Sequence, residues 1–357
     1  MYFEVNRQNF RETRVAEPEP QPLEPGQVRL AIERFAVTTN NITYAVAGDM
    51  LDYWGFFPVD DQWGRLPVMG LAEITESANP NINVGGRYFG FYPMADQVVI
   101  DAQGASGAFR DAGPHRSNHA VVYTGFRNVA DDPDFRPELA NEYLLLWGMF
   151  MTSFLADDYL ADNNFHGAKQ TLVTSASSKT SISLAACLAK RGSHRAVGLT
   201  SERNRAFVEG LGLYDQVITY DEIDQLDSSV ASGMVDMAGS GTVRTNVHNH
   251  FADNLQYSLT VGATHWEDMA GEAALPGPTP EMFFAPGQSA KRAKDWGANE
   301  LARRVDGAFA SLLDSSSDWL TVDHRTGADG IQQVYNQLVN GTANPSSGFI
   351  VSMGDAE

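Results

Sequence analysis

From Gln170 onward, short apolar strands alternate with helices, and this alternation constrains the fold more than any other feature of the sequence. The segment QTLVTSA has the pattern of a strand, KTSISLAACLAKRG of a helix, HRAVGLTS of a strand and ERNRAFVEGLG of a helix. Three further strands are expected in DQVITYDE, SGMVDMAGS and LQYSLTVGAT. Strands that alternate with helices along a chain form a parallel sheet covered on both faces. We therefore expect a doubly wound α/β domain in this part of the chain.

The segments on either side of this alternation have a different character. Residues 1–125 show short strands with Gly, Pro and Asn between them, and Val28, Leu30 and Ile32 alternate as in a half-buried strand. ELANEYLLLWGMFMTSFLADDYLADNN predicts a buried helix, and PGPTPEMFFAPGQSAKRAKDWG predicts a loop. A helix in ANELARRVDGAFASLLDSSSD and a last strand in SGFIVSM follow. We expect this tail to complete the β-rich first domain.

Composition excludes several classes of function. The 357 residues carry a formal net charge of −20, which disfavours nonspecific binding to nucleic acid or to anionic membranes. The first residues contain no apolar secretory segment, and no apolar run has the length of a membrane span. Cys187 is the single cysteine, so a zinc site built on several thiolates is impossible. A cytoplasmic location is expected.

The turn between the first strand and helix of the alternation lies where nucleotide-binding proteins hold phosphate, yet it contains no glycine. Lys179 and Thr180 match the end of a Walker loop, but Val173 and Ser178 occupy its two glycine positions. A dinucleotide turn needs small residues that let a pyrophosphate approach the helix. We therefore favour a dinucleotide turn with these cofactor-binding residues: Ser175, Ser177, Ser178, Lys179 and Thr180.

The end of the next strand indicates which dinucleotide is bound. An unphosphorylated ribose usually meets an Asp or Glu at this position. Here Thr200 and Ser201 end the strand, and Arg203 and Arg205 follow, with Glu202 between them. Hydroxyl and guanidinium groups are suited to a 2′-phosphate, so the sequence predicts NADPH as the cofactor.

These segments together resemble the medium-chain dehydrogenase/reductase superfamily, and most closely its zinc-independent quinone oxidoreductase and enoyl reductase branch. The resemblance extends in order over nearly the whole chain. AVTTNNITYAVAG is similar to the family's substrate-cleft segment, which maps to Asn40 or Asn41, with Tyr44 and Gly48. It further rests on the segments LPVMGLAEITES, VGGRYFGF, MFMTSFLADDYL, VTSASSKTSISLAACLAK, MVDMAGS and LTVGAT.

The resemblance implies a fold and two further cofactor contacts. It implies a GroES-like β-rich catalytic domain in residues 1–130 and 281–357, and a Rossmann doubly wound parallel sheet domain in residues 131–280. It also implies that Thr152 faces the cofactor and that Gly262 lies in the turn that approaches the nicotinamide. Homodimers are common among proteins of this kind, so a homodimer is also expected.

The sequence departs from the zinc-dependent members of this superfamily. The catalytic half contains no cysteine and no GHE segment, whereas a catalytic zinc needs three protein ligands. His115 and His119 are four residues apart and His248 and His250 two apart, and we expect these side chains to cap turns or lie at the surface. No metal is expected at the site.

Without zinc, the favoured substrate is a conjugated acceptor such as an enone, an enoyl thioester or a quinone. Hydride addition produces an enolate that needs hydrogen-bond donors. Tyr44 is the first candidate donor, Asn40 and Asn41 are candidates for positioning, and His265 is a further acid candidate. Trp266 follows His265 after the strand expected nearest the nicotinamide, and Phe283 and Phe284 are candidate cleft walls. The basic cluster of Lys291, Arg292 and Lys294 is a candidate for attracting a substrate that carries a carboxylate or phosphate.

Three hypotheses follow. The first is an NADPH-dependent reductase of an activated C=C bond or a quinone, acting on a small-molecule substrate. The second is a catalytically decayed dinucleotide-binding protein of the same fold, with a sensing or interaction role, which the missing glycines motivate. The third is an enzyme that binds ATP through Lys179 and Thr180, although no second motif for Mg²⁺ accompanies them.

Overall fold

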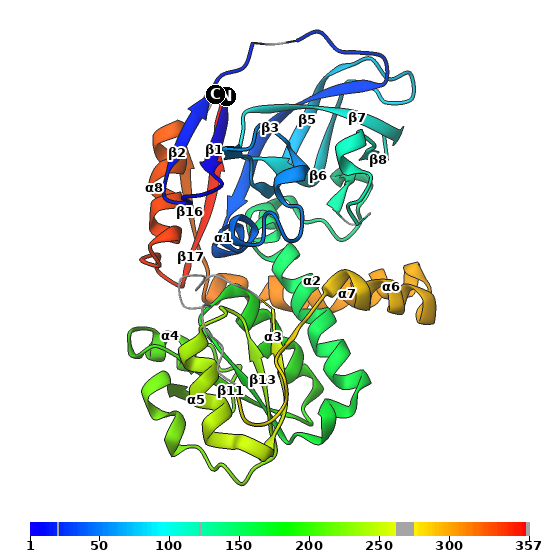
Figure 1. Ribbon diagram of the computed structural model, residues 1–357. Coiled ribbons are helices and arrows are strands. Elements are labelled where there is room, and N and C mark those ends of the chain that lie inside the picture. Colours follow the sequence, from blue (N-terminus) through cyan, green and yellow to red (C-terminus); the bar gives the residue numbers. More distant parts are fainter. Residues whose placement is uncertain (20, 121–122, 262–274, 355–357) are drawn as a thin grey trace. The chain divides into compact units, whose positions relative to one another are not determined.

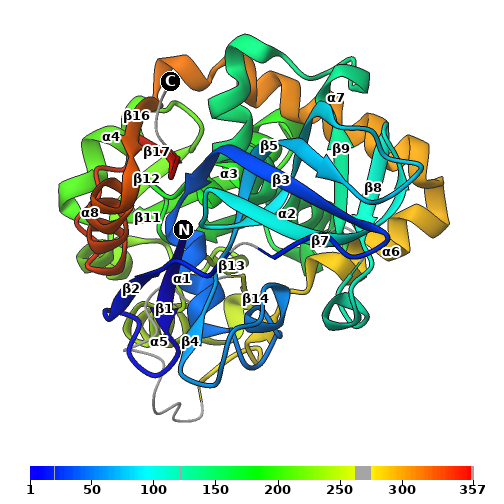
Figure 2. The same ribbon diagram turned by 90° about the horizontal axis from the view of Figure 1, so that it is seen from above.

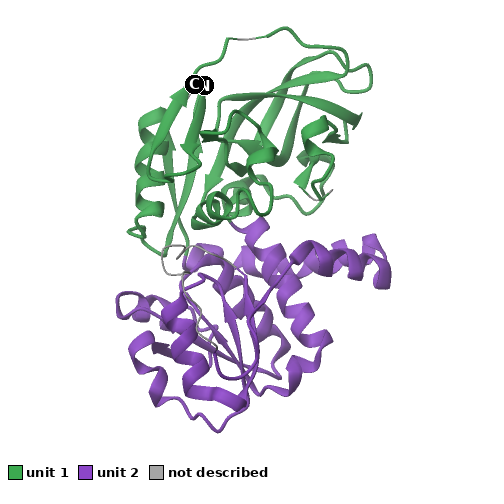
Figure 3. Ribbon diagram, in the orientation of Figure 1, with its two compact units in different colours: residues 1–145, 320–357 green, residues 146–319 purple. Residues whose placement is uncertain are grey.

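The structure, a computed structural model, describes residues 1–19, 21–120, 123–261 and 275–354. The chain divides into two compact units (Figure 3). Unit 1 contains residues 1–145 and 320–357, and unit 2 contains residues 146–319. Among the described residues, no helix has both the length and the apolar composition that crossing a membrane requires.

Unit 1 consists mainly of antiparallel strands. Its strands are β1 (Tyr2–Asn6), β2 (Thr13–Ala16), β3 (Gln27–Val37), β4 (Trp63–Gly64), β5 (Pro67–Ser77), β6 (Gly85–Pro93), β7 (Gln97–Ala105), β8 (Ala108–Asp111), β9 (Gly125–Asn128), β16 (Thr321–Thr326) and β17 (Ser347–Ser352). Its helices are α1 (Thr39–Val46) and α8 (Gly327–Val339). The helix α2 (Ala140–Asp162) begins in unit 1 and continues into unit 2.

A closed barrel is formed in unit 1 by the strands β3, β5, β6, β9, β8 and β7, whereas β2, β1 and β4 form a separate sheet. The eight-stranded sheet has the order β16-β17-β3-β5-β6-β9-β8-β7, and β7 also pairs with β3 (Figure 2). Val28, Leu30 and Ile32 of β3 are buried, which confirms the alternation expected from the sequence. The C-terminal strand β17 pairs with β3, so the tail completes the β-rich unit as predicted.

Unit 2 is an α/β unit with a parallel sheet. Its strands are β10 (Gln170–Val173), β11 (Arg195–Thr200), β12 (Gln216–Thr219), β13 (Ser232–Asp236), β14 (Leu255–Thr260) and β15 (Glu281–Met282). Besides its part of α2, its helices are α3 (Lys179–Arg191), α4 (Arg205–Gly210), α5 (Gly241–Phe251), α6 (Ala285–Trp296) and α7 (Ala298–Asp314).

The strand order in unit 2 is that of a Rossmann domain. All neighbouring strands are parallel in the order β12-β11-β10-β13-β14-β15 (Figure 1). Leu184 and Leu188 of α3 pack on one face of the sheet with Leu160 of α2. Val247 and Phe251 of α5 pack on the other face. The strand order reverses between β10 and β13, which is where open α/β sheets bind their ligands.

Two sequence predictions differ from the observed fold. Residues 281–319 belong to unit 2 rather than to the β-rich unit 1, because β15 pairs with β14 and extends the parallel sheet. The stretch predicted as a loop before Gly297 contains α6. Its Pro286 lies in the first helical turn, where a missing backbone N–H costs no intrahelical hydrogen bond.

Candidate functional site

The turn between β10 and α3 takes a conformation that normally requires glycine. Ser175 has a φ of 49°, in the left-handed region. Its neighbours fix the turn, since the Ala176 N–H donates to the Leu199 carbonyl over 3.0 Å and the Ser178 N–H donates to the Ser175 carbonyl over 2.7 Å. The backbone of a glycine-type turn is therefore present although the sequence has no glycine there.

Two serines of this turn hold the helix start. Ser178 is the N-cap of α3, and its Oγ accepts from the Ser181 N–H over 3.1 Å. The Ser181 hydroxyl donates to the Thr174 carbonyl over 2.8 Å, so the 2.8 Å contact between the two Oγ atoms requires Ser178 to donate. The single hydroxyl hydrogen of Ser178, which the sequence assigned to a phosphate, is used within the turn.

Lys179 and Thr180 form the first turn of α3. Burial lowers the pKa of Lys179 to about 8. The Thr180 carbonyl accepts a hydrogen bond of 2.7 Å from Ser153 of α2, which fixes this end of the helix. A lysine at a helix N-terminus adds positive charge where the helix dipole already favours an anion.

The carboxyl end of β11 lies beside this turn. Asn204 donates a hydrogen bond of 3.0 Å from Nδ2 to the Ser177 Oγ and so joins the two loops. Thr200 is 1% exposed, and its Oγ1 has no hydrogen-bond partner in the described part of the chain. Ser201 is half-buried, and Arg203 is exposed. Polar side chains of the turn after β10 and of the loop after β11 are thus gathered at the carboxyl ends of these two strands.

Arg205 has a different position from Arg203. Its guanidinium forms an ion pair with Glu222 and lies 3.6 Å from a carboxylate oxygen of Glu202. Glu222 also accepts from the Thr219 N–H in a capping box. Much of the positive charge of Arg205 is therefore balanced by carboxylates.

Three residues that were not predicted from the sequence, Tyr220, Thr174 and Asp236, also form hydrogen bonds that position these loops. The Tyr220 hydroxyl accepts from the Ser175 N–H over 3.2 Å. Thr174 donates a hydrogen bond of 2.9 Å to Asp236, and thereby joins the carboxyl ends of β10 and β13. Thr174 directly follows β10 and Asp236 ends β13, which is a signal that the sequence offered. The Tyr220 contact instead joins positions 45 residues apart.

In unit 1, the two asparagines of α1 have different roles. Asn41 is buried, its Oδ1 accepts from the Thr38 N–H over 2.7 Å, and its Nδ2 donates to the Pro67 carbonyl over 2.9 Å. It therefore fixes the start of α1 against β5. The side chain of Asn40 hydrogen-bonds the Tyr44 hydroxyl instead.

Tyr44 belongs to a group of three tyrosines. Its ring stacks on that of Tyr53 with centroids 4.2 Å apart, and the hydroxyls of Tyr53 and Tyr123 share a hydrogen bond. Burial raises the pKa of all three phenols, so each remains protonated at neutral pH. Protonated phenols donate hydrogen bonds and do not act as bases.

The histidines only partly match the prediction. His115 lies 3.5 Å from Asp111, and the His250 Nε2 is 2.8 Å from the Leu226 carbonyl. The expectation of surface positions is wrong for His119, whose side chain is 4% exposed, and for His248, which is fully buried. The His119 ring packs on the Phe56 ring at a centroid distance of 4.3 Å. His248 is buried because both ring nitrogens have partners, the Pro276 carbonyl and the Ser258 Oγ, each at 2.9 Å.

The remaining candidates lie elsewhere. Thr152 donates to the Gly148 carbonyl over 3.2 Å within α2. Phe283 has its ring 5.8 Å from that of Tyr159, while Phe284 is 57% exposed. Gly262, His265 and Trp266 lie outside the described residues.

The basic cluster of α6 has a structural role. Arg292 forms ion pairs with Asp158 over 2.6 Å and with Asp162 over 2.9 Å, and Lys291 forms one with Asp162 over 2.6 Å. Both side chains therefore attach α6 to α2. Lys294 is exposed on the same helix.

Solved structures with the same fold span the whole chain. The yhdH oxidoreductase from Salmonella enterica, in complex with NADP, has 14% identity and a TM-score of 0.60, with 99% of both chains covered. CurA from Vibrio vulnificus has 12% identity and a TM-score of 0.61, covering 98% of this chain and 96% of its own. The CurK enoyl reductase has 10% identity and a TM-score of 0.54, covering 98% and 99%.

These likenesses confirm the predicted fold, a GroES-like β-rich domain with a Rossmann domain, as in medium-chain dehydrogenases and reductases. No curated protein matches the sequence. The chain belongs to the family described as "Protein of unknown function (DUF2855)", whose match extends over residues 35–344.

Proposed function

We propose that this protein is an NADPH-dependent reductase of an activated C=C bond or a quinone. The observation that carries the proposal is the joining of the β10–α3 turn to the loop after β11, at the reversal of strand order in a Rossmann sheet. The yhdH and CurA structures have the same fold, and each has been crystallised with NADP or NADPH.

The residues present fit such a cofactor. The buried Thr200 Oγ1 has no partner in the described part of the chain and lies at the strand end that meets the ribose in this fold. Arg203 would bind the 2′-phosphate, and Lys179 with the first turn of α3 would bind the pyrophosphate. When bound, the reduced nicotinamide supplies the hydride.

The chain itself would supply hydrogen-bond donors to the substrate. Tyr44 is kept protonated by burial, and Asn40 orients its hydroxyl. A phenol in this state donates a hydrogen bond to a carbonyl oxygen and to the more basic enolate oxygen that replaces it. The hydrogen bond between Tyr53 and Tyr123 fixes the ring that stacks on Tyr44.

We propose that the reaction needs no zinc and takes place in the cytoplasm. The groups around Tyr44 are the phenols of Tyr53 and Tyr123 and the amide of Asn40. In the described ranges, no three His, Cys, Asp or Glu side chains gather as metal ligands. Activity that is unchanged after treatment with a chelator would support a reaction without zinc. Activity that a chelator removes and zinc restores would contradict it.

The cofactor is tested by titrating the protein with NADPH and NADH while following nicotinamide fluorescence. We expect NADPH to bind more tightly, and Arg203→Ala to weaken NADPH about tenfold or more while leaving NADH nearly unchanged. Arg195→Ala is the matched control, because Arg195 is exposed at the opposite end of β11. Preference for NADH, or no binding of either nucleotide, would refute the cofactor.

The reaction is tested by following NADPH oxidation with conjugated aldehydes, ketones, enoyl thioesters and quinones. We expect turnover of at least one class, and Tyr44→Phe is expected to lower kcat by about 100-fold or more. Turnover that is unchanged in Tyr44→Phe would remove this residue from the mechanism.

One observation favours the second hypothesis, a dinucleotide-binding protein without catalysis. The Ser178 hydroxyl donates within the turn and is not available to a phosphate. Tight NADPH binding with no oxidation by any of the four acceptor classes would support this alternative.

A further inference from the structure

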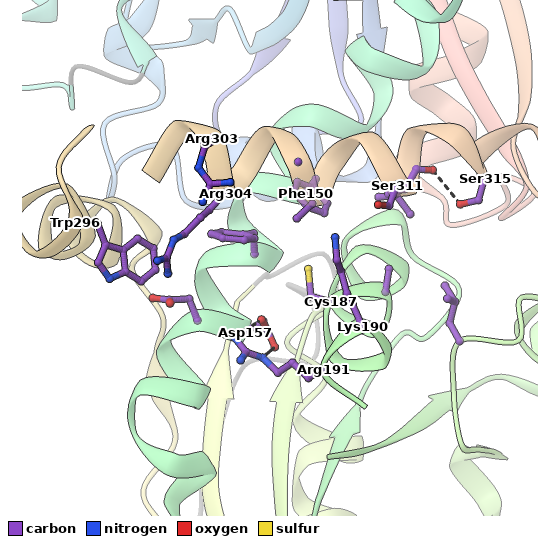
Figure 4. A pocket seen from close by; sticks show the side chains of 17 residues that line it. Phe150, Asp157, Cys187, Lys190, Arg191, Trp296, Arg303, Arg304, Ser311 and Ser315 are labelled. Atoms are coloured by element: carbon purple, nitrogen blue, oxygen red, sulfur yellow. Dashed lines mark hydrogen bonds and ion pairs between the residues drawn. The ribbon is translucent and has the colours of Figure 1, made fainter. Parts of the chain in front are cut away.

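A cavity lies entirely within unit 2, between α2, α3 and α7. Its volume is about 760 Å³, which is within the range of small-molecule sites. It lies toward the C-terminal end of α3, where Cys187 and Lys190 line it (Figure 4). Lys190 follows Lys179 by eleven residues, about 16 Å along the helix at 1.5 Å per residue. The cavity is therefore separate from the candidate dinucleotide site.

The walls of the cavity are largely apolar. Phe150 and Phe154 line it from α2, Cys187 from α3, Leu312 from α7, and the Trp296 ring closes one end. Burial raises the pKa of the Cys187 thiol, so this group behaves as a small neutral wall residue. Such walls are suited to the hydrocarbon part of a ligand.

The carboxylates that line the cavity are already paired with cations. Asp157 forms a two-fold hydrogen-bonded pair with Arg191, at 2.7 and 2.8 Å. Asp158 pairs with Arg292 over 2.6 Å. Neither carboxylate is left to repel an anionic ligand.

The basic side chains of α3 and α7 that line the cavity outnumber the carboxylates that pair with them. Arg303 and Arg304 of α7 share one carboxylate, Glu300, with N–O distances of 2.7 Å each. In the part of the chain that the structure describes, no carboxylate lies within ion-pair distance of Lys190. Its side chain extends from α3 toward α7 beside Cys187 (Figure 4). A cavity with surplus positive charge is unusual in a chain with a net charge of −20.

We propose that this cavity binds an amphipathic monocarboxylate, with its apolar chain against Phe150, Phe154 and Leu312 and its carboxylate on Lys190. A lysine in the last turn of a helix also interacts favourably with the helix dipole. That interaction accounts for the charge of Lys190, but not for its position on the wall of the cavity. Lys190 is itself exposed, so its charge stays hydrated while its side chain lines the cavity.

The proposal is tested by calorimetric titration of the full chain with dodecanoate below its micellar concentration. Dodecanol, which has the same chain and no charge, is the ligand control. We expect one dodecanoate to bind per chain and dodecanol to bind at least tenfold more weakly. Lys190→Met is expected to raise the Kd for dodecanoate about tenfold.

Lys169→Met is the matched control variant, because Lys169 is an exposed lysine of unit 2 outside the cavity. It is expected to leave the Kd within about twofold of the unmodified protein. A second variant, Ser311→Phe, fills the cavity from α7 without changing charge, and it is expected to abolish binding while circular dichroism shows an intact fold. If Lys190→Met fails to fold, Ser311→Phe still decides the question.

Three results would overturn the proposal. They are no binding of dodecanoate, equal binding of dodecanoate and dodecanol, and equal loss of binding in Lys190→Met and Lys169→Met. Self-association that Ser311→Phe abolishes, with no binding of dodecanoate, would show that a second copy of the chain covers the cavity instead.

Discussion

Replacing Ser178 with alanine distinguishes a structural hydroxyl from a phosphate ligand. In the structure this hydroxyl caps α3 through the Ser181 N–H and donates to the buried Ser181 Oγ. Loss of an N-cap side chain costs about 1 kcal/mol. Loss of the donor to a buried hydroxyl costs about 1 kcal/mol more. We therefore expect Ser178→Ala to lower the free energy of unfolding by about 2 kcal/mol.

The same variant has little effect on the cofactor if the hydroxyl is fully used within the turn. We expect the Kd for NADPH, extrapolated to fully folded protein, to change by less than about threefold, since 1.4 kcal/mol corresponds to a tenfold change. Stability is measured by urea unfolding, with hydrogen exchange of residues 172–192 as a local readout. Affinity is measured by nicotinamide fluorescence.

Ser178→Asn is the matched control, because asparagine caps helices about as well as serine. It is expected to restore most of the lost stability. The reasoning would be refuted if Ser178→Ala unfolded like the original protein and bound NADPH at least tenfold more weakly. That result would make the hydroxyl a phosphate ligand, as the sequence first suggested.

Two further predictions concern charge in unit 2. Burial holds the pKa of Lys179 at about 8, so its ammonium loses a proton as the pH rises through that value. NADPH affinity is therefore expected to fall between pH 7 and pH 9. If the Kd of a Lys179→Met variant changed with pH as steeply as that of the original protein, this explanation would be contradicted. Arg292→Met leaves the carboxylate of Asp158 buried without its cation, and is expected to lower the free energy of unfolding by about 3 kcal/mol in urea. Lys291→Met, at an exposed pair, is expected to cost less than about 1 kcal/mol, and equal losses would contradict the difference in burial.

Regular patterns in the sequence were sufficient to predict the layers of the fold. The strand and helix periods of residues 170–260 lie within short stretches of chain, so they can be recognised locally. The helix α6 was missed because Pro286 and Gly287 at its start look like loop residues. Proline in the first turn is compatible with a helix, and packing of Arg292 against α2 then stabilises it.

The sequence predicts a candidate phosphate-binding turn between β10 and α3, but it does not predict the hydrogen bonds within that turn. Small and hydroxyl-bearing residues after a strand indicate a phosphate-binding turn, but they do not show which hydroxyl is used as a cap. Ser178 caps α3, whereas Ser177 accepts from Asn204, which lies 27 residues away. The pairing of Arg205 with Glu222 joins positions 17 residues apart. Such contacts depend on the folded arrangement of the strands, which a local pattern does not contain.

The return of β17 to the sheet of unit 1 has a consequence for synthesis on the ribosome. β17 pairs with β3, and between them the chain contains all of residues 146–319. Domains generally fold as units while the chain emerges from its N-terminus. We therefore expect unit 2, which is one continuous stretch, to complete its sheet first. Until β17 arrives, residues 35–37 of β3 lack this partner strand, whereas residues 27–31 pair with β7. Nascent chains of this protein are therefore expected to be most prone to aggregation in that interval.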